Sequence, residues 1–149
     1  MELISNLFDM DLSKLVPDLP VFLGFVHTLL VLAVLIGPIL LVVLGALYLF
    51  KPAPEANFKY GFRTYFGMGS IEAWQFSQKM AGLIFGGLGA LLLIIMFIVV
   101  LTFIGKDLFR IAGTAIVCLI IQALLTLAAR LTIGFLCWKY FDKDGQRKQ

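Results

Sequence analysis

The length of the uncharged hydrophobic runs constrains this chain more than any other feature. The first run, Val21 to Phe50, contains no formally charged residue. Thirty residues of α-helix extend about 45 Å, whereas the hydrocarbon core of a bilayer is about 30 Å thick. Of the 149 residues, 61% are hydrophobic and only 14% are charged, more apolar surface than a water-soluble fold can bury. The sequence predicts an all-α integral membrane protein with three transmembrane helices, at about residues 21–50, 71–104 and 111–138.

A short amphipathic segment precedes the first run. Between Leu3 and Val16 the apolar residues recur at spacings of three and four, and Pro17 and Pro20 end the pattern. The sequence therefore predicts a short interfacial helix within an extracytoplasmic N-terminal segment, residues 1–20. Its acidic character differs from the basic start of a cleaved signal peptide, so we expect it to be retained. It acts either as a collar that positions the first span or as a flap over the bundle.

The cations are distributed unevenly between the two ends of the predicted spans. Three fall on the side of the N-terminus: Lys14, Lys106 and Arg110. Eight fall on the other side: Lys51, Lys59, Arg63, Lys79, Lys139, Lys143, Arg147 and Lys148. Because Lys and Arg concentrate in cytoplasmic segments, the N-terminus is predicted to lie outside the cell. The loop 51–70 and the polar tail 139–149 are predicted to be cytoplasmic, and we expect the tail to fray.

Small residues in the second predicted span indicate close helix packing. Gly82 and Gly86 are four residues apart and Ala90 extends the same spacing, whereas Gly89 is expected to lie one position off this face. Small side chains let the backbones of membrane helices approach one another. The pattern fits packing within one chain, and it also fits the face of a homo-oligomer.

Two polar side chains lie within the third predicted span. We expect Gln122 to hydrogen-bond a neighbouring helix. Arg130 has two interpretations: it snorkels at the membrane interface, or it lies inside the bundle, where an unpaired charge is costly and usually functional.

The loop between the first two spans is rich in aromatic residues, glycines and cations. Ser70 is a suitable N-cap for the second helix, with Glu72 in its first turn. The candidate binding residues of this region are Asn57, Gly61, Arg63, Thr64, Ser70 and Trp74. Arg63 either organises the loop through hydrogen bonds or binds a lipid phosphate or a carboxylate of a peptide partner. Trp74 is either part of this site or an interfacial anchor.

This loop resembles the corresponding segment of the SdpI/YfhL family of small bacterial membrane proteins. The likeness rests on G-F-R-T at 61–64, on S-x-x-x-W at 70–74 and on the following F-S-Q-K, and it spans roughly residues 30 to 105. The matching positions are Pro52, Asn57, Gly61, Arg63, Thr64, Met68, Trp74 and Phe76. Gly67, Ser70 and Ser77 depart from the family's usual residues, which are Ser, Asn, and Ala or Asn.

The resemblance implies a protein of the bacterial cytoplasmic membrane that gives immunity to a secreted, membrane-active peptide toxin. It also implies signalling, because some family members capture a cytoplasmic repressor. The expected partners are thus membrane lipids, a peptide toxin or a cytoplasmic protein. Many SdpI-like proteins carry further N-terminal helices that this sequence does not show, which weakens the expectation of repressor capture.

No residue set in the sequence is typical of catalysis, and neither a cofactor, a metal nor a nucleic-acid partner is expected. The single His27 lies in the first span, and the predicted spans contain no acidic residue for a proton relay. Two alternatives stay open beside immunity and signalling. One is a small oligomeric transporter or lipid-handling subunit, with Gln122 and Arg130 lining a path. The other is a structural subunit of a larger membrane complex.

Overall fold

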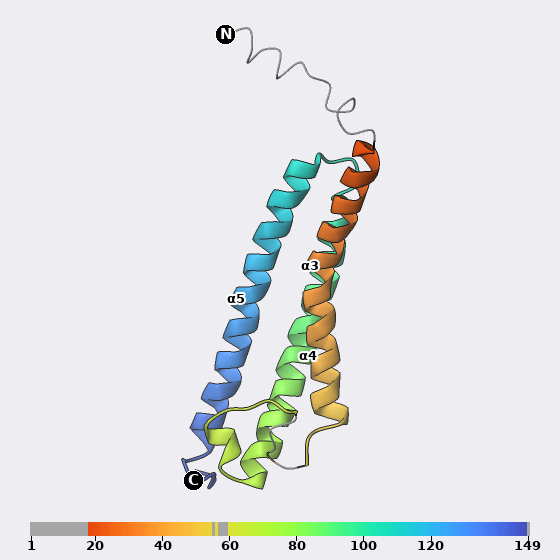
Figure 1. Cartoon of the computed structure of the whole chain (residues 1–149). Helices are drawn as coiled ribbons and strands as arrows, with labels where there is room; N and C mark the ends of the chain where they lie inside the picture. Colours follow the sequence, from red (N-terminus) through yellow and green to blue (C-terminus); the bar gives the residue numbers. More distant parts are fainter. Residues whose placement is uncertain (1–17, 55, 57–59, 149) are drawn as a thin grey trace.

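The computed structural model describes residues 18–54, 56 and 60–148, and within them the chain forms three long helices (Figure 1). These are α3 (Leu19–Phe50), α4 (Ile71–Leu101) and α5 (Leu108–Tyr140), with one turn of 3-10 helix, η1 (Phe66–Met68), between α3 and α4. All three are long and apolar enough to cross a membrane, which confirms the prediction of three helices that can span it. The predicted amphipathic helix of the N-terminal segment lies outside the described residues.

The helix bounds differ from the expected ones near the connections. α4 ends at Leu101 rather than at residue 104, and α5 already begins at Leu108. The turn between them contains Gly105, whose φ of 73° suits a residue without a side chain. We call this the turn end of the bundle. The loop 51–70 and the C-terminus lie together at the opposite end, which we call the loop end (Figure 1).

Glycines bring α3 and α4 into close contact. A β-carbon on Gly45 of α3 would overlap the backbone of Gly86, and one on Gly82 would lie 2.5 Å from Cγ of Leu49. The next contact is made by Gly89, where a β-carbon would lie 2.7 Å from the backbone nitrogen of Val42. Ala90, predicted to continue this face, is instead exposed. Gly82 and Gly86 therefore serve packing within the chain, and α3 packs on α4 more extensively than either packs on α5.

A hydrogen bond in the middle of the bundle joins α5 to α3. Pro38 has no backbone N–H, so the carbonyl of Val34 lacks the donor that would normally follow four residues later. The side-chain amide of Gln122 donates to this carbonyl at 2.9 Å. Gly37 leaves room for it, because a β-carbon there would lie 2.5 Å from the Gln122 Oε1 atom. The predicted contact of Gln122 with a neighbouring helix thus compensates for the proline.

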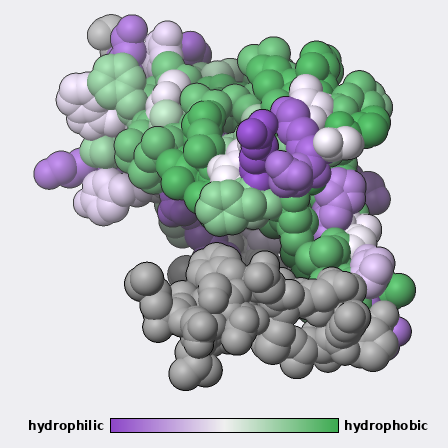
Figure 2. Space-filling view, turned by 90° about the horizontal axis from the view of Figure 1, so that it is seen from above, coloured by the Kyte–Doolittle hydropathy of each residue, from purple (hydrophilic) through white to green (hydrophobic). Residues whose placement is uncertain are grey.

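The outer surface of the bundle is apolar, as expected of a protein in contact with lipid. Viewed along the bundle from above (Figure 2), hydrophobic residues cover most of the visible described surface and hydrophilic residues form small patches. Large exposed hydrophobic side chains occur on all three helices, for example Ile36, Phe97 and Leu124. Together with the three spans, this surface describes a multi-pass membrane protein.

The proline and the glutamine are expected to be energetically coupled. Gln122→Leu should lower the stability of the bundle by about 1 kcal/mol, because it leaves the Val34 carbonyl without a donor. In a Pro38→Ala background the new N–H of residue 38 can serve that carbonyl, so the same substitution should cost less. Thermal or denaturant unfolding of the four proteins in detergent micelles measures this coupling. Equal costs in both backgrounds would contradict the compensation.

Candidate functional site

The loop between α3 and α4 is held by a side chain of α4 that binds its backbone. Gln78, fully buried, accepts a hydrogen bond from the Phe62 N–H at 2.9 Å and donates one to the Phe62 carbonyl at 2.8 Å. One amide side chain thus satisfies both the backbone N–H and the backbone C=O of Phe62, which in a β-sheet would pair with a neighbouring strand. The Gln78 amide also donates to the hydroxyl of Ser77, which in turn donates to the Trp74 carbonyl.

Trp74 fixes the beginning of the loop. Its indole N–H donates to the carbonyl of Ala53 at 2.8 Å, and the side chain is completely buried. The ring lies directly against Gly61, where a β-carbon would be 2.5 Å from the indole Cζ2 atom. Gly61 also has a φ of 121°, which L side chains rarely adopt. The glycine of G-F-R-T is therefore required both by its backbone conformation and by the tryptophan.

Phe62 inserts its ring between α3 and α4. Its centroid lies 5.4 Å from that of Phe85 and 6.4 Å from that of Tyr48, and both pairs are edge-to-face. Such pairs stabilise beyond the area that they bury. The loop is thus anchored by its backbone on Gln78 and by an aromatic side chain in the apolar interior.

Thr64 closes the tip of the loop and connects it to α5. Its hydroxyl accepts a hydrogen bond from the Gly67 N–H at 3.0 Å, and its side chain lies close to that of Cys137 of α5. Gly67 is buried against Ser77, so the departures from the family's usual residues at 67 and 77 contact each other. Arg63, Tyr60 and Tyr65 are exposed, and Arg63 and Tyr60 each interact with another residue.

The C-terminal tail covers the start of α4. Residues 141–148 form a tight hairpin around Asp142, whose carboxylate accepts from the N–H groups of Asp144 and Gln146. The Ser70 hydroxyl donates to the Gly145 carbonyl at 2.7 Å and also accepts from the Ala73 N–H, which confirms the predicted N-cap. The expectation of a fraying tail was wrong, because local turns and the contact with Ser70 provide its backbone with partners.

Two arginines line a common cleft between the loop and α5. One cavity of about 430 Å³ is bounded by the loop residues 62–64 and by one face of α5. Its lining residues on α5 are Arg130, Leu131, Gly134, Phe135 and Trp138. A second cavity of about 280 Å³ shares Phe62, Arg63 and Arg130 with the first and adds Tyr48 and Gly61. We call these two cavities the arginine cleft, and none of the described residues that line it is acidic.

The arginine cleft locates Arg130 along the bundle. Arg130 is exposed rather than enclosed by the three helices, and α5 continues through it without interruption. Tyr48, in the last turn of α3, lines the same cavity, so Arg130 is level with the end of the first hydrophobic run. It also lies about 30 Å along α5 from Arg110, the thickness of a hydrocarbon core. Both measures favour an interfacial arginine.

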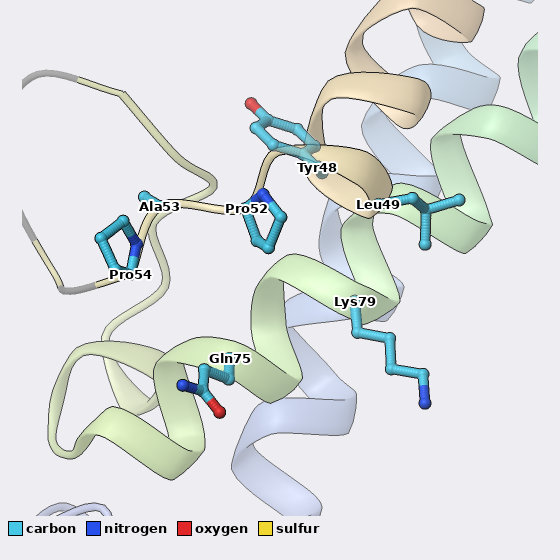
Figure 3. A pocket seen from close by; sticks show the side chains of 7 residues that line it. All are labelled: Tyr48, Leu49, Pro52, Ala53, Pro54, Gln75 and Lys79. Atoms are coloured by element: carbon cyan, nitrogen blue, oxygen red, sulfur yellow. The ribbon is translucent and has the colours of Figure 1, made fainter.

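Another hollow at the loop end does not gather polar groups around one point. It has a volume of about 310 Å³ and lies between the end of α3, residues 52–54 and α4 (Figure 3). In this view the ammonium group of Lys79 and the hydroxyl of Tyr48 point away from each other. The described residues also contain no group of three or more His, Cys, Asp or Glu side chains that could hold a metal.

Of the predicted binding residues, Asn57 lies outside the described part of the chain, and the other five are gathered at the loop end. Gly61, Thr64, Ser70 and Trp74 hold the loop and the tail, whereas Arg63 lines the arginine cleft. Arg130, considered separately in the sequence, lines that cleft too. Gln78 and Ser77 were not identified from the sequence as residues of the site. A signal was available, because two polar residues near the start of a helix, close to the small residue Ala81, indicate a buried polar face.

The model of the SdpI/YfhL protein family matches residues 55–135, more than half of the chain. The chain belongs to this family. The resemblance covered roughly residues 30 to 105, whereas the match begins after the end of α3 and continues through most of α5, including Gln122 and Arg130. Searches of curated proteins and of solved structures returned no match.

The glutamine that holds the loop is expected to be its main anchor. Gln78→Leu should lower the free energy of unfolding by about 2–4 kcal/mol, because two buried backbone groups of Phe62 lose their partners. Hydrogen exchange of residues 60–68 should accelerate as well. Gln75→Leu, which changes an exposed glutamine one turn earlier, is the matched control. Similar effects of the two substitutions would show that the loop does not depend on Gln78.

Proposed function

We propose that this SdpI/YfhL family member protects a bacterial cell from a secreted, membrane-active peptide toxin and presents its G-F-R-T loop to a partner. In this proposal the loop end faces the cytoplasm and the N-terminus lies outside. The distribution of cations supports this orientation. Among the described residues, Lys51, Arg63, Lys79, Lys139, Lys143, Arg147 and Lys148 lie at the loop end, against Lys106 and Arg110 at the turn end.

The observation that carries the proposal is the set of contacts that anchors loop residues 60–68 to the bundle. Gln78, Trp74 and Phe62 fix its inner side, while Arg63 and Tyr65 remain on its outer side, with Tyr65 75% exposed. A surface with an arginine and an aromatic ring in fixed positions is typical of protein recognition sites. A preorganised loop also binds without a large cost of ordering.

The bundle offers less support for the alternative of a transport path. Such a path would need Gln122 to face an open channel, whereas its amide donates to the Val34 carbonyl and the side chain is buried. Arg130 lies beside the loop and not between the three helices. Immunity and signalling are therefore the functions that we retain.

A protection assay tests the proposal. The chain is expressed in a toxin-sensitive bacterium without its own family member, and the cells are challenged with an SDP-type peptide. Wild type should survive, and Arg63→Ala should reduce survival to that of cells without the protein, since the recognising charge is lost. Tyr65→Ala should weaken protection, while Lys79→Ala, an exposed cation of α4, should leave it unchanged.

Protein level and membrane insertion are measured in the same cells, so that lost protection cannot be assigned to lost protein. Protection that persists in both loop variants would move the activity from the loop to the spans. No protection by well-inserted wild type would refute immunity to that peptide.

A further inference from the structure

We propose that the arginine cleft binds the phosphate of an anionic phospholipid from the leaflet on the loop side. Arg63 approaches from the loop and Arg130 from α5, so a headgroup would bridge two segments that are 67 residues apart in the sequence. This site goes beyond the proposed function, because it would exist whether or not the chain confers immunity.

The charge of the cleft favours an anion. Two guanidinium groups line the same cavities, and no carboxylate is among the described residues that line either cavity. Glu72, an acidic residue at this end, lies against Arg147 instead, at 3.8 Å. Like charges that share a cleft at a membrane interface repel each other, and a bound phosphate would remove this repulsion. Guanidinium groups suit phosphate because they donate two parallel hydrogen bonds.

The other lining groups extend the polar part of the site. Tyr48 contributes a phenol to the second cavity, and Thr64 contributes its hydroxyl side chain to the first. Arg63 already interacts with another residue of the chain, but a guanidinium group has five N–H donors and can serve more than one partner. Arg130 makes no hydrogen bond or ion pair with the part of the chain that the structure describes.

The depth of the cleft matches that of lipid phosphates. Arg130 is about 30 Å along α5 from Arg110, so Arg110 lies at one boundary of the hydrocarbon core and Arg130 lies at the other. Leu131 and Phe135 are 64% and 56% exposed beside Arg130 and give the cleft an apolar wall. A lipid is thus a better occupant than a soluble phosphate, which would have no use for this wall. Basic pockets between membrane helices are a known form of anionic lipid recognition.

Native mass spectrometry of the full chain released from detergent micelles tests the site. The protein is equilibrated with equal amounts of phosphatidylglycerol and phosphatidylcholine that carry the same acyl chains, and the single-lipid adducts are compared. Wild type should prefer phosphatidylglycerol. Arg63→Gln and Arg130→Gln should each reduce this preference about fivefold, the factor expected for one basic side chain near an anionic headgroup. Arg110→Gln, an exposed arginine at the turn end of the same helix, should not change it.

Two additions keep the test decisive. Arg130→Lys should retain part of the preference, and unfolding temperatures should show that all variants are folded. An excess of inorganic phosphate should leave the lipid adduct in place. The proposal is overturned if wild type shows no preference, if the preference survives in the Arg63→Gln/Arg130→Gln double variant, or if inorganic phosphate displaces the lipid completely. The last result would assign the cleft to a soluble anion.

The lipid site and the proposed immunity can fail separately. Tyr65 does not line the arginine cleft, so Tyr65→Ala should weaken protection without affecting the lipid preference. Arg130→Gln should reduce the lipid preference, because Arg130 lines the cleft. A wild-type protein that shows one property without the other would therefore identify which of the two proposals is wrong.

Discussion

The structure depends on one constraint of the bilayer: a backbone N–H or C=O group at the membrane needs a protein partner, since little water is available there. The helices meet this need internally, but the loop and the proline do not. Two glutamines solve the problem. Gln78 serves both backbone groups of Phe62, and Gln122 serves the carbonyl that Pro38 leaves without a donor.

These two contacts divide the molecule into regions of different character. α3 and α4 meet through glycines and form a tight pair, and the loop is built onto the end of this pair by Trp74, Gln78 and Phe62. α5 is held at a few points, through Gln122 in the middle and through Thr64 and the tail at the loop end. The arginine cleft lies where the firmly packed part meets the less closely packed helix.

The sequence predicted the features that contact with the lipid bilayer imposes on the chain. Long apolar runs have few alternatives to spanning helices, and Ser70 indicated where α4 begins. The contacts that depend on direction were harder. The spacing of Gly82 and Gly86 suggested Ala90 as the next contact. Counted from Gly82, however, the eight residues to Ala90 rotate the helix about 80° beyond two full turns, whereas the seven residues to Gly89 end only about 20° short of two turns. Gly89 therefore lies closer to the face of Gly82 than Ala90 does. Gln78 and Arg130 gain their roles from a loop that returns to the bundle, which no periodicity reveals.

The prediction for the tail was wrong in the opposite direction from that for Ala90. A contact was expected at Ala90 and is not made, whereas the tail was expected to fray and forms a defined turn. Asp142 and Gly145 form that turn, and Gly145 has a φ of 74° and lies directly against Ser70. Composition reports how a segment interacts with water on average. Composition does not report that a residue of the tail, Gly145, contacts Ser70, which lies 75 positions earlier in the chain.

The contact between Ser70 and Gly145 also bears on how the chain is assembled in the membrane. Gly145 is among the last described residues, so the start of α4 receives this partner only after α5 has been synthesised. Once α4 has crossed the bilayer, the two residues can meet only if α5 crosses it as well, which returns the chain to the same side. The contact therefore discriminates between a correctly threaded chain and one in which α5 has remained outside the membrane or inserted in the opposite direction.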